Sequence, residues 1–152
     1  MNIQITILPE EVSFAKQAIQ TFDAQKTYNK FTCTNNYIGF LGELVLHKYL
    51  TTNHISHEWN NFIQKGWNKP DFIINNKSID LKTTVTNGLW YQTPKYDYYI
   101  AAHINQENTL LTIKGIIGSQ EMLTKSQVIT HHNRTDYLIP FEKLNTLYWN
   151  EI

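Results

Sequence analysis

Residues 70–82 read Pro-Asp-Phe-Ile-Ile-Asn-Asn-Lys-Ser-Ile-Asp-Leu-Lys, and this is the most informative segment of the chain. Two apolar runs enclose a polar turn at residues 75–77, a pattern typical of a β-hairpin. Because side chains alternate between the two faces of a strand, Asp80 and Lys82 are predicted to share one face. The hairpin also returns Asp71 to the neighbourhood of Asp80. The sequence therefore predicts two carboxylates and a lysine close together on one strand pair.

A helix predicted ahead of the hairpin adds a third carboxylate. Residues 39–43 read Gly-Phe-Leu-Gly-Glu, and a glycine inside a helix costs roughly 1 kcal/mol relative to alanine. Gly39 and Gly42 are three residues apart, hence on one helix face, where they would permit close approach to another backbone. Glu43 follows at once. A helix pressed against the sheet would hold its carboxylate beside the two strand acids.

The donor set favours a hard divalent cation. Carboxylates brought together repel one another unless a cation joins them. Oxygen ligands without thiolates suit Mg²⁺ or Mn²⁺. The single cysteine, Cys33, excludes an internal disulfide and a zinc site built on several thiolates.

A helix with Gly-x-x-Gly-Glu, followed by Pro-Asp, a short hairpin and Asp-x-Lys, resembles the PD-(D/E)XK nuclease superfamily. That superfamily includes restriction, repair and recombination enzymes, and the resemblance covers roughly residues 37–84. It implies an α+β fold of the α/β/α restriction-endonuclease-like kind, with a central mixed β-sheet flanked by helices. It also implies that Asp71 and Asp80 bind metal, that Glu43 supports the metal, and that Lys82 orients or activates the attacking water.

The role of the lysine has two interpretations that are compatible with each other. Burial would lower the pKa of Lys82, enough to let it shuttle a proton. The same side chain could also neutralise the charge of Asp80. Residues 92–96 also resemble the Gln-x-x-x-Tyr element of the exonuclease branch, although Pro94 would break the helix that carries it.

The resemblance implies Mg²⁺-dependent hydrolysis of phosphodiester bonds in DNA, with Mn²⁺ as a substitute, and an endonuclease is expected. Because so small a chain cuts one strand per site, a homodimer would supply the second site. A rival interpretation is a catalytically silent nuclease-fold module that binds nucleic acid or a protein partner. A third treats the acids as coincidental charges on a structural interaction domain.

Composition predicts one globular domain over residues 1–152. A hydrophobic fraction of 41% and an aromatic fraction of 13% suit a folded core. The net charge of zero limits how much phosphate the chain can neutralise, and a single arginine, Arg134, excludes multiple bidentate contacts to guanine. Neither an apolar run of about 18 residues nor a secretory signal is visible. We therefore expect a cytoplasmic protein without a membrane partner.

The remaining pattern predicts two leading helices and then a mostly consecutive sheet. The expected helices are residues 9–25, about 36–50, 119–125 and 141–147. The expected strands are residues 3–7, 55–59, 71–74, 78–83, 98–103, 110–117 and, as a last edge strand, 137–139.

The histidines and the later basic residues are weaker candidates. His47 lies four residues after Glu43 and so either approaches the site or is a partly buried structural residue. His54, His57 and residues 131–132 lack the ligand spacing of a zinc site and are expected to be solvated. The basic stretch formed by Lys125, residues 131–132 and Arg134 either contacts phosphates or is a solvated loop, and both alternatives remain open.

Overall fold

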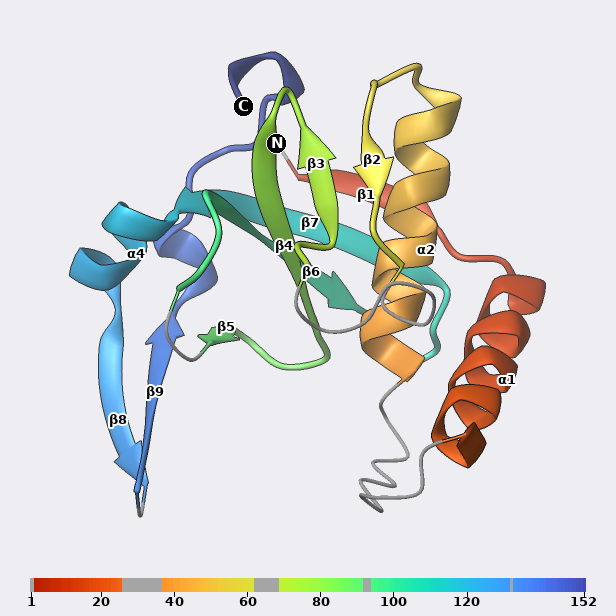
Figure 1. The fold of residues 1–152 in the computed structure, drawn as a ribbon, viewed down its shortest axis with the longest axis horizontal. Coiled ribbons are helices and arrows are strands. Elements are labelled where there is room, and N and C mark those ends of the chain that lie inside the picture. The colour runs from red at the N-terminus through yellow and green to blue at the C-terminus, as the bar shows by residue number, and fades with distance from the viewer. Residues whose placement is uncertain (1, 26–36, 62–68, 92–93, 132) are drawn as a thin grey trace.

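The computed structural model describes residues 2–25, 37–61, 69–91, 94–131 and 133–152. Within these ranges the protein has an α+β fold (Figure 1). Its helices are α1 (Pro9–Gln25), α2 (Tyr37–Thr52) and α4 (Ser119–Lys125), with 3₁₀ turns at Phe141–Lys143 and Trp149–Glu151. Its strands are β1 (Ile3–Thr6), β2 (Glu58–Trp59), β3 (Phe72–Ile74), β4 (Lys77–Thr84), β5 (Leu89–Tyr91), β6 (Tyr98–Ile104), β7 (Leu110–Gly118), β8 (Gln127–His131) and β9 (Arg134–Ile139). None of the helices in the described ranges combines the length and apolar character that crossing a membrane requires.

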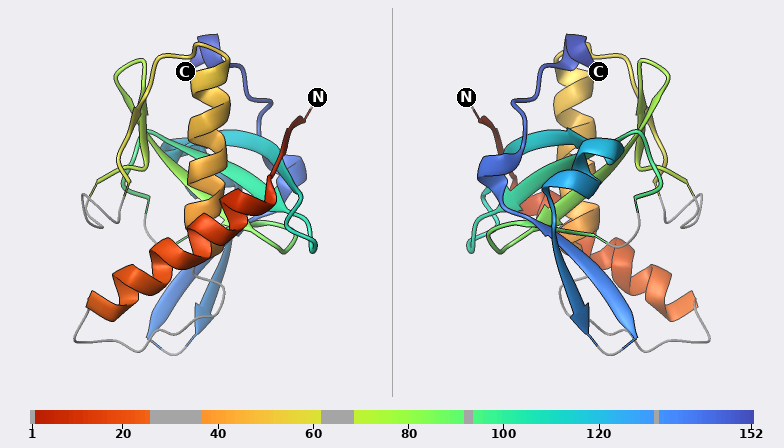
Figure 2. Two further views of the ribbon diagram at one scale, coloured as in Figure 1. Left: turned by 90° about the vertical axis from the view of Figure 1, so that its right-hand side faces the viewer. Right: turned by 90° about the vertical axis from the view of Figure 1, so that its left-hand side faces the viewer.

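Six of the described strands form a strongly curled, mixed sheet in the order β1-β7-β6-β4-β3-β2, as predicted for the centre of the fold. Strands β4 and β6 are parallel, and the other neighbours are antiparallel. A second sheet, in the order β5-β9-β8, projects from the first as a narrow ribbon (Figure 1). Helices α1 and α2 lie on one side of the large sheet, and α4 with the ribbon lies on the other (Figure 2).

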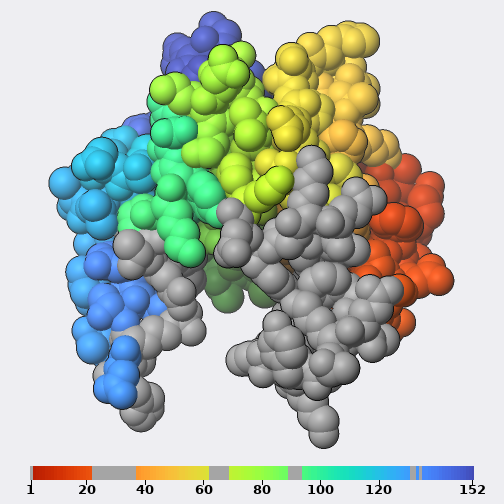
Figure 3. All heavy atoms as spheres, in the orientation of Figure 1, coloured from red at the N-terminus to blue at the C-terminus, as the bar shows by residue number. Residues whose placement is uncertain are grey.

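The hairpin of β3 and β4 forms as expected and is tighter than the sequence indicated. Asn75 and Asn76 alone make the turn, with φ angles of 50° and 61°. Two successive residues with positive φ define the turn whose twist matches that of the flanking strands, and asparagine tolerates this conformation well. Lys77 therefore joins β4, and Phe72 pairs with Ile79. On the surface, the hairpin lies beside β2 (Figure 3).

The two leading helices match their predicted ranges, although the cap residues 35–36 lie outside the described part of the chain. Helix α1 begins at Pro9, where the Glu11 side chain accepts a hydrogen bond of 2.9 Å from the backbone N–H of Leu8. Lys48 of α2 forms an ion pair with Glu11 and so ties the two helices together. Helix α2 buries its apolar face against the large sheet.

Three expectations for the C-terminal part of the chain are wrong. Strand β9 is the central strand of the small sheet, because β5 pairs with one of its edges and β8 with the other. No strand was predicted between residues 83 and 98, where β5 forms. The expected helix at 141–147 shortens to a 3₁₀ turn, because Asn145 exchanges two backbone hydrogen bonds of 2.9 Å with Ile116 of β7. Pairing with an existing strand satisfies both backbone groups and overrides local helix propensity.

Candidate functional site

The β3–β4 hairpin places two of the predicted acids together. Asp71 directly precedes β3, and continuing the register by one residue sets it opposite Asp80. The Oδ2 atom of Asp71 accepts a hydrogen bond of 2.7 Å from the backbone N–H of Leu81. This bond spans the two strands where their regular pairing ends. The orientation of Asp71 is therefore set by the neighbouring strand.

Helix α2 carries the third acid, Glu43, and packs closely against β4 at Gly42. A Cβ atom built on Gly42 would lie 2.0 Å from Oγ1 of Thr83 in β4, so the helix can approach the strand this closely only with glycine here. The predicted role of Gly39 is wrong, because a Cβ there would meet nothing within 4 Å among the described residues. Glu43 follows Gly42 and is 5% exposed.

Substitution of Gly42 or Gly39 by alanine is expected to change the stability of the protein in opposite directions. Gly42→Ala is expected to destabilise the protein by about 1–3 kcal/mol, because the added methyl group must push α2 away from Thr83. Gly39→Ala, its control in the same helix, is expected to stabilise by roughly 0.5–1 kcal/mol through helix propensity. Urea denaturation of both variants measures the two changes. Equal effects of the two substitutions would contradict the close contact between α2 and β4.

Burial and neighbouring charge raise the affinity of two of the acids, Glu43 and Asp71, for protons. Burial, and then the charge of Asp71, raises the pKa of Glu43 to about 9. Burial, and then the charge of Asp80, raises the pKa of Asp71 to about 7. Glu43 and Asp71 are also hydrogen-bonded through their side chains, a bond in which the protonated Glu43 donates to the Asp71 carboxylate. The carboxyl groups of this cluster therefore ionise more readily when a positive charge is added beside them.

Lys82 supplies one such charge. Its Nζ atom lies 2.7 Å from Oδ2 of Asp80, and its side chain remains 41% exposed. Burial lowers the pKa of Lys82, but the charges of Asp80 and Asp71 outweigh burial and the net shift is upward. The expectation that the pKa of Lys82 would fall far enough for it to shuttle a proton is therefore wrong. Lys82 is a cation held between the acids and solvent.

Tyrosines border the cluster on the sheet face that carries Asp80 and Lys82. Tyr99 and Ala101 pair in parallel register with these two residues and belong to a small core with residues of α4 and β9. The Tyr99 hydroxyl accepts a hydrogen bond of 2.6 Å from the backbone N–H of Lys95. Burial, followed by the charges of Asp80 and Asp71, raises the pKa of Tyr96, which places its hydroxyl within the electrostatic reach of the acids. The sequence pattern had included Tyr96 through the Gln-x-x-x-Tyr resemblance, whose residues 92 and 93 lie outside the described residues.

Sequence reasoning missed Trp59, which contacts the cluster directly. Its indole Nε1–H donates a hydrogen bond of 3.1 Å to Oε2 of Glu43. Behind it, His47 stacks on the indole ring at a centroid distance of 4.5 Å. His57 is hydrogen-bonded to His47 at 2.8 Å, so its expected solvation is wrong, whereas His54 is exposed as predicted. No signal in the sequence linked Trp59 to Glu43, because β2 reaches the helix only through its pairing with β3.

The residues fit a hard divalent cation in chemistry, although their present spacing does not enclose one. Asp71, Asp80 and Glu43 offer carboxylate oxygens, the donor type that Mg²⁺ and Mn²⁺ prefer, and Oδ2 of Asp80 is at present paired with Nζ of Lys82 at 2.7 Å. Within the described ranges, however, no three His, Cys, Asp or Glu side chains lie close enough together to hold a metal ion as they stand.

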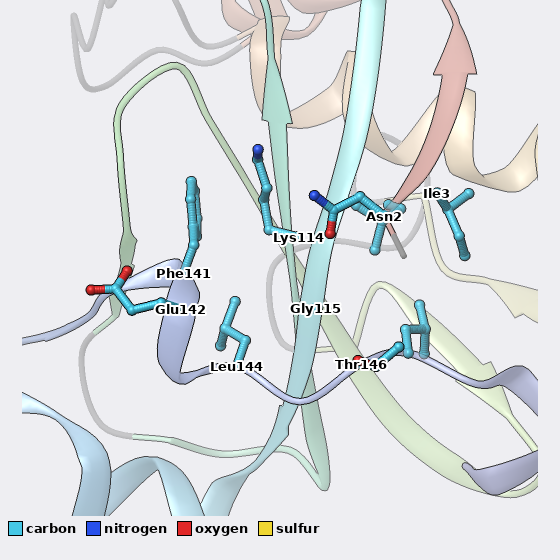
Figure 4. Close-up of a pocket in the computed structure, with 10 residues that line it drawn as sticks. Asn2, Ile3, Lys114, Gly115, Phe141, Glu142, Leu144 and Thr146 are labelled. Atoms are coloured by element: carbon cyan, nitrogen blue, oxygen red, sulfur yellow. The ribbon is translucent and has the colours of Figure 1, made fainter.

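Two other features lie apart from the cluster. Lys125 of the predicted basic stretch is paired with Glu121, and residue 132 lies outside the described residues. A pocket of about 200 Å³ lies between β7 and the C-terminal segment, where Lys114 extends over the ring of Phe141 (Figure 4). None of the four predicted site residues lines this pocket.

A comparison of the chain with protein-family models, curated proteins and solved structures finds no match.

Proposed function

We propose that this protein is a metal-dependent nuclease of the PD-(D/E)XK type with a restriction-endonuclease-like fold. In this proposal it hydrolyses phosphodiester bonds within DNA, using Mg²⁺ or, as a substitute, Mn²⁺. Asp71, Asp80 and Glu43 hold the metal, and Lys82 acts on the attacking water. A homodimer would provide two such sites for paired cuts.

The observation that carries the proposal is that side chains from three separate elements interact in one cluster. Glu43 comes from α2, Asp71 precedes β3, and Asp80 and Lys82 belong to β4. Burial and neighbouring charge raise the pKa of Glu43 and of Asp71, so the ionised, metal-free state of these two acids is destabilised. Concentrated perturbations of this kind are more typical of functional sites than of surface charge pairs.

The chemistry assigns a distinct task to each group. A divalent ion held by the carboxylates supplies the positive charge that lets a nucleophile approach the negative phosphodiester. Lys82, two residues from Asp80 on the same strand, places a second positive charge at the exposed side of the cluster. From there it can hold a water molecule by hydrogen bonding and stabilise the charge that develops as the water attacks.

A second candidate function is a catalytically silent nuclease-fold module that binds nucleic acid or a protein partner. The observation favouring it is that the acids, in the described part of the chain, are not spaced to hold a metal ion. The absence of net positive charge favours a protein partner over extensive contact with phosphates.

A cleavage panel tests the proposal. End-labelled single-stranded, duplex and branched DNA, together with RNA, are incubated with Mg²⁺, Mn²⁺ or EDTA. We expect internal cuts in DNA that require the divalent ion. Asp80→Asn protein purified in parallel controls for contaminating nucleases. Cleavage that persists in EDTA, or no cleavage of any substrate with either metal, would contradict the proposal, and the second outcome would favour the silent module.

A further inference from the structure

Trp59 contacts the carboxyl group of Glu43 directly. Strand β2 pairs Trp59 with Phe72, the residue that follows Asp71, so the indole reaches Glu43 from the strand beside β3. The Nε1–H group donates to one carboxylate oxygen of Glu43, Oε2, at 3.1 Å. Glu43 is also hydrogen-bonded to Asp71. The carboxyl group is therefore held by an indole as well as by another acid.

Two rings from α2 pack against the indole of Trp59. His47 of α2 lies against it with an interplanar angle of 26° and a centroid distance of 4.5 Å. The ring of Phe40 lies 6.1 Å away. Both rings come from α2, the helix that carries Glu43. The helix that carries the hydrogen-bond acceptor therefore also holds the indole donor in place. An indole has only two side-chain rotations, and this packing restricts both.

A hydrogen-bond chain fixes the supporting histidine. Nδ1 of His57 lies 2.7 Å from the carbonyl oxygen of Ile55, which can only accept, so this nitrogen carries a proton. In a neutral ring, Nε2 of His57 is then an acceptor, and His47 donates to it through Nδ1 at 2.8 Å. This order of donors follows from the network. It anchors the stack to the backbone just before β2.

We infer that Trp59 is a positioning residue for the metal site: its indole N–H orients the Glu43 carboxyl group for binding a divalent cation. The inference rests on the proposed function. A donor that engages one oxygen fixes the rotation of the carboxyl group and leaves the other oxygen facing the acids. Partners of this kind behind a metal ligand are worth about 10- to 100-fold in metal affinity when removed.

Trp149 provides a matched control. Its Nε1 atom is buried and has no hydrogen-bond partner among the described residues. Its ring packs 6.3 Å from that of Tyr49, so Trp149→Phe retains an aromatic contact and removes an N–H without an acceptor. Trp59→Phe likewise retains the ring against His47 but removes the donor to Glu43. The two substitutions remove the same atoms and differ in one hydrogen bond.

Calorimetric titration with Mg²⁺ alone compares the two variants with the wild type. We expect Trp59→Phe to bind Mg²⁺ about 10- to 100-fold more weakly and Trp149→Phe to bind it as the wild type does. Equal affinity of Trp59→Phe and wild type would overturn this inference and leave the proposed function intact. Absence of Mg²⁺ binding by the wild type would overturn the proposed function and this inference together.

A second measurement requires neither metal nor a folded Trp59 variant. The indole ¹H–¹⁵N signal of Trp59, assigned by triple-resonance NMR, is compared in wild type and Glu43→Ala. We expect it to move upfield when its acceptor is removed, while the Trp149 signal stays in place. An unchanged Trp59 signal would overturn the inference.

Discussion

Lys82→Ala is expected to lower the rate of DNA cleavage by roughly 10²- to 10⁴-fold, while Mg²⁺ binding persists. The substitution removes the positive charge beside the attacking water and keeps all three proposed metal ligands. It also frees Oδ2 of Asp80 from its ion pair, so Mg²⁺ affinity should rise. A loss confined to kcat, with substrate binding preserved, is the signature of an interaction made in the transition state.

Lys77→Ala is the control for this experiment, because Lys77 lies on the same strand but is exposed at its far end. Turnover and Tm are measured on the same preparations. If Lys82 served only to neutralise Asp80, the variant would have a lower Tm and unchanged activity per folded molecule. That result would remove Lys82 from the proposed chemistry.

Asp80→Asn is expected to abolish the stabilisation of the protein by Mg²⁺. A ligand that binds only the native state at 100 times its dissociation constant stabilises that state by about 2.7 kcal/mol. For a domain of about 150 residues this corresponds to a rise in Tm of about 5 to 10 °C. The amide keeps the size of Asp80 but removes the charge that a hard cation requires.

Glu107→Gln is the matched control, since Glu107 is an exposed acid in the turn between β6 and β7. Thermal melts with increasing Mg²⁺, and with EDTA as the baseline, give the shift for each variant. We expect Glu107→Gln to retain the full shift. An equal Mg²⁺ shift in Asp80→Asn and wild type would show that the stabilising ion binds elsewhere.

The pairing of Asp71 with Asp80 was predictable because it depends on local chemistry. Two asparagines suited to positive φ set the turn, and the two-residue period of a strand then sets which side chains face each other. The ranges of α1 and α2 were predictable for a similar reason. Proline and acids at the helix start, and apolar residues at helical spacing, act over short stretches of sequence.

The sequence by itself determined the α+β class, the hairpin and the four residues of the candidate cluster. Tertiary structure alone decided how those residues are held, because the contacts concerned join segments distant in sequence. It brought Gly42 rather than Gly39 against Thr83, and it placed the indole of Trp59 on Glu43. It also reversed the expected direction of the Lys82 pKa, because two carboxylates gathered around the side chain outweigh its burial. Burial can be estimated from a residue's own pattern, whereas the charges around it depend on where the rest of the chain folds.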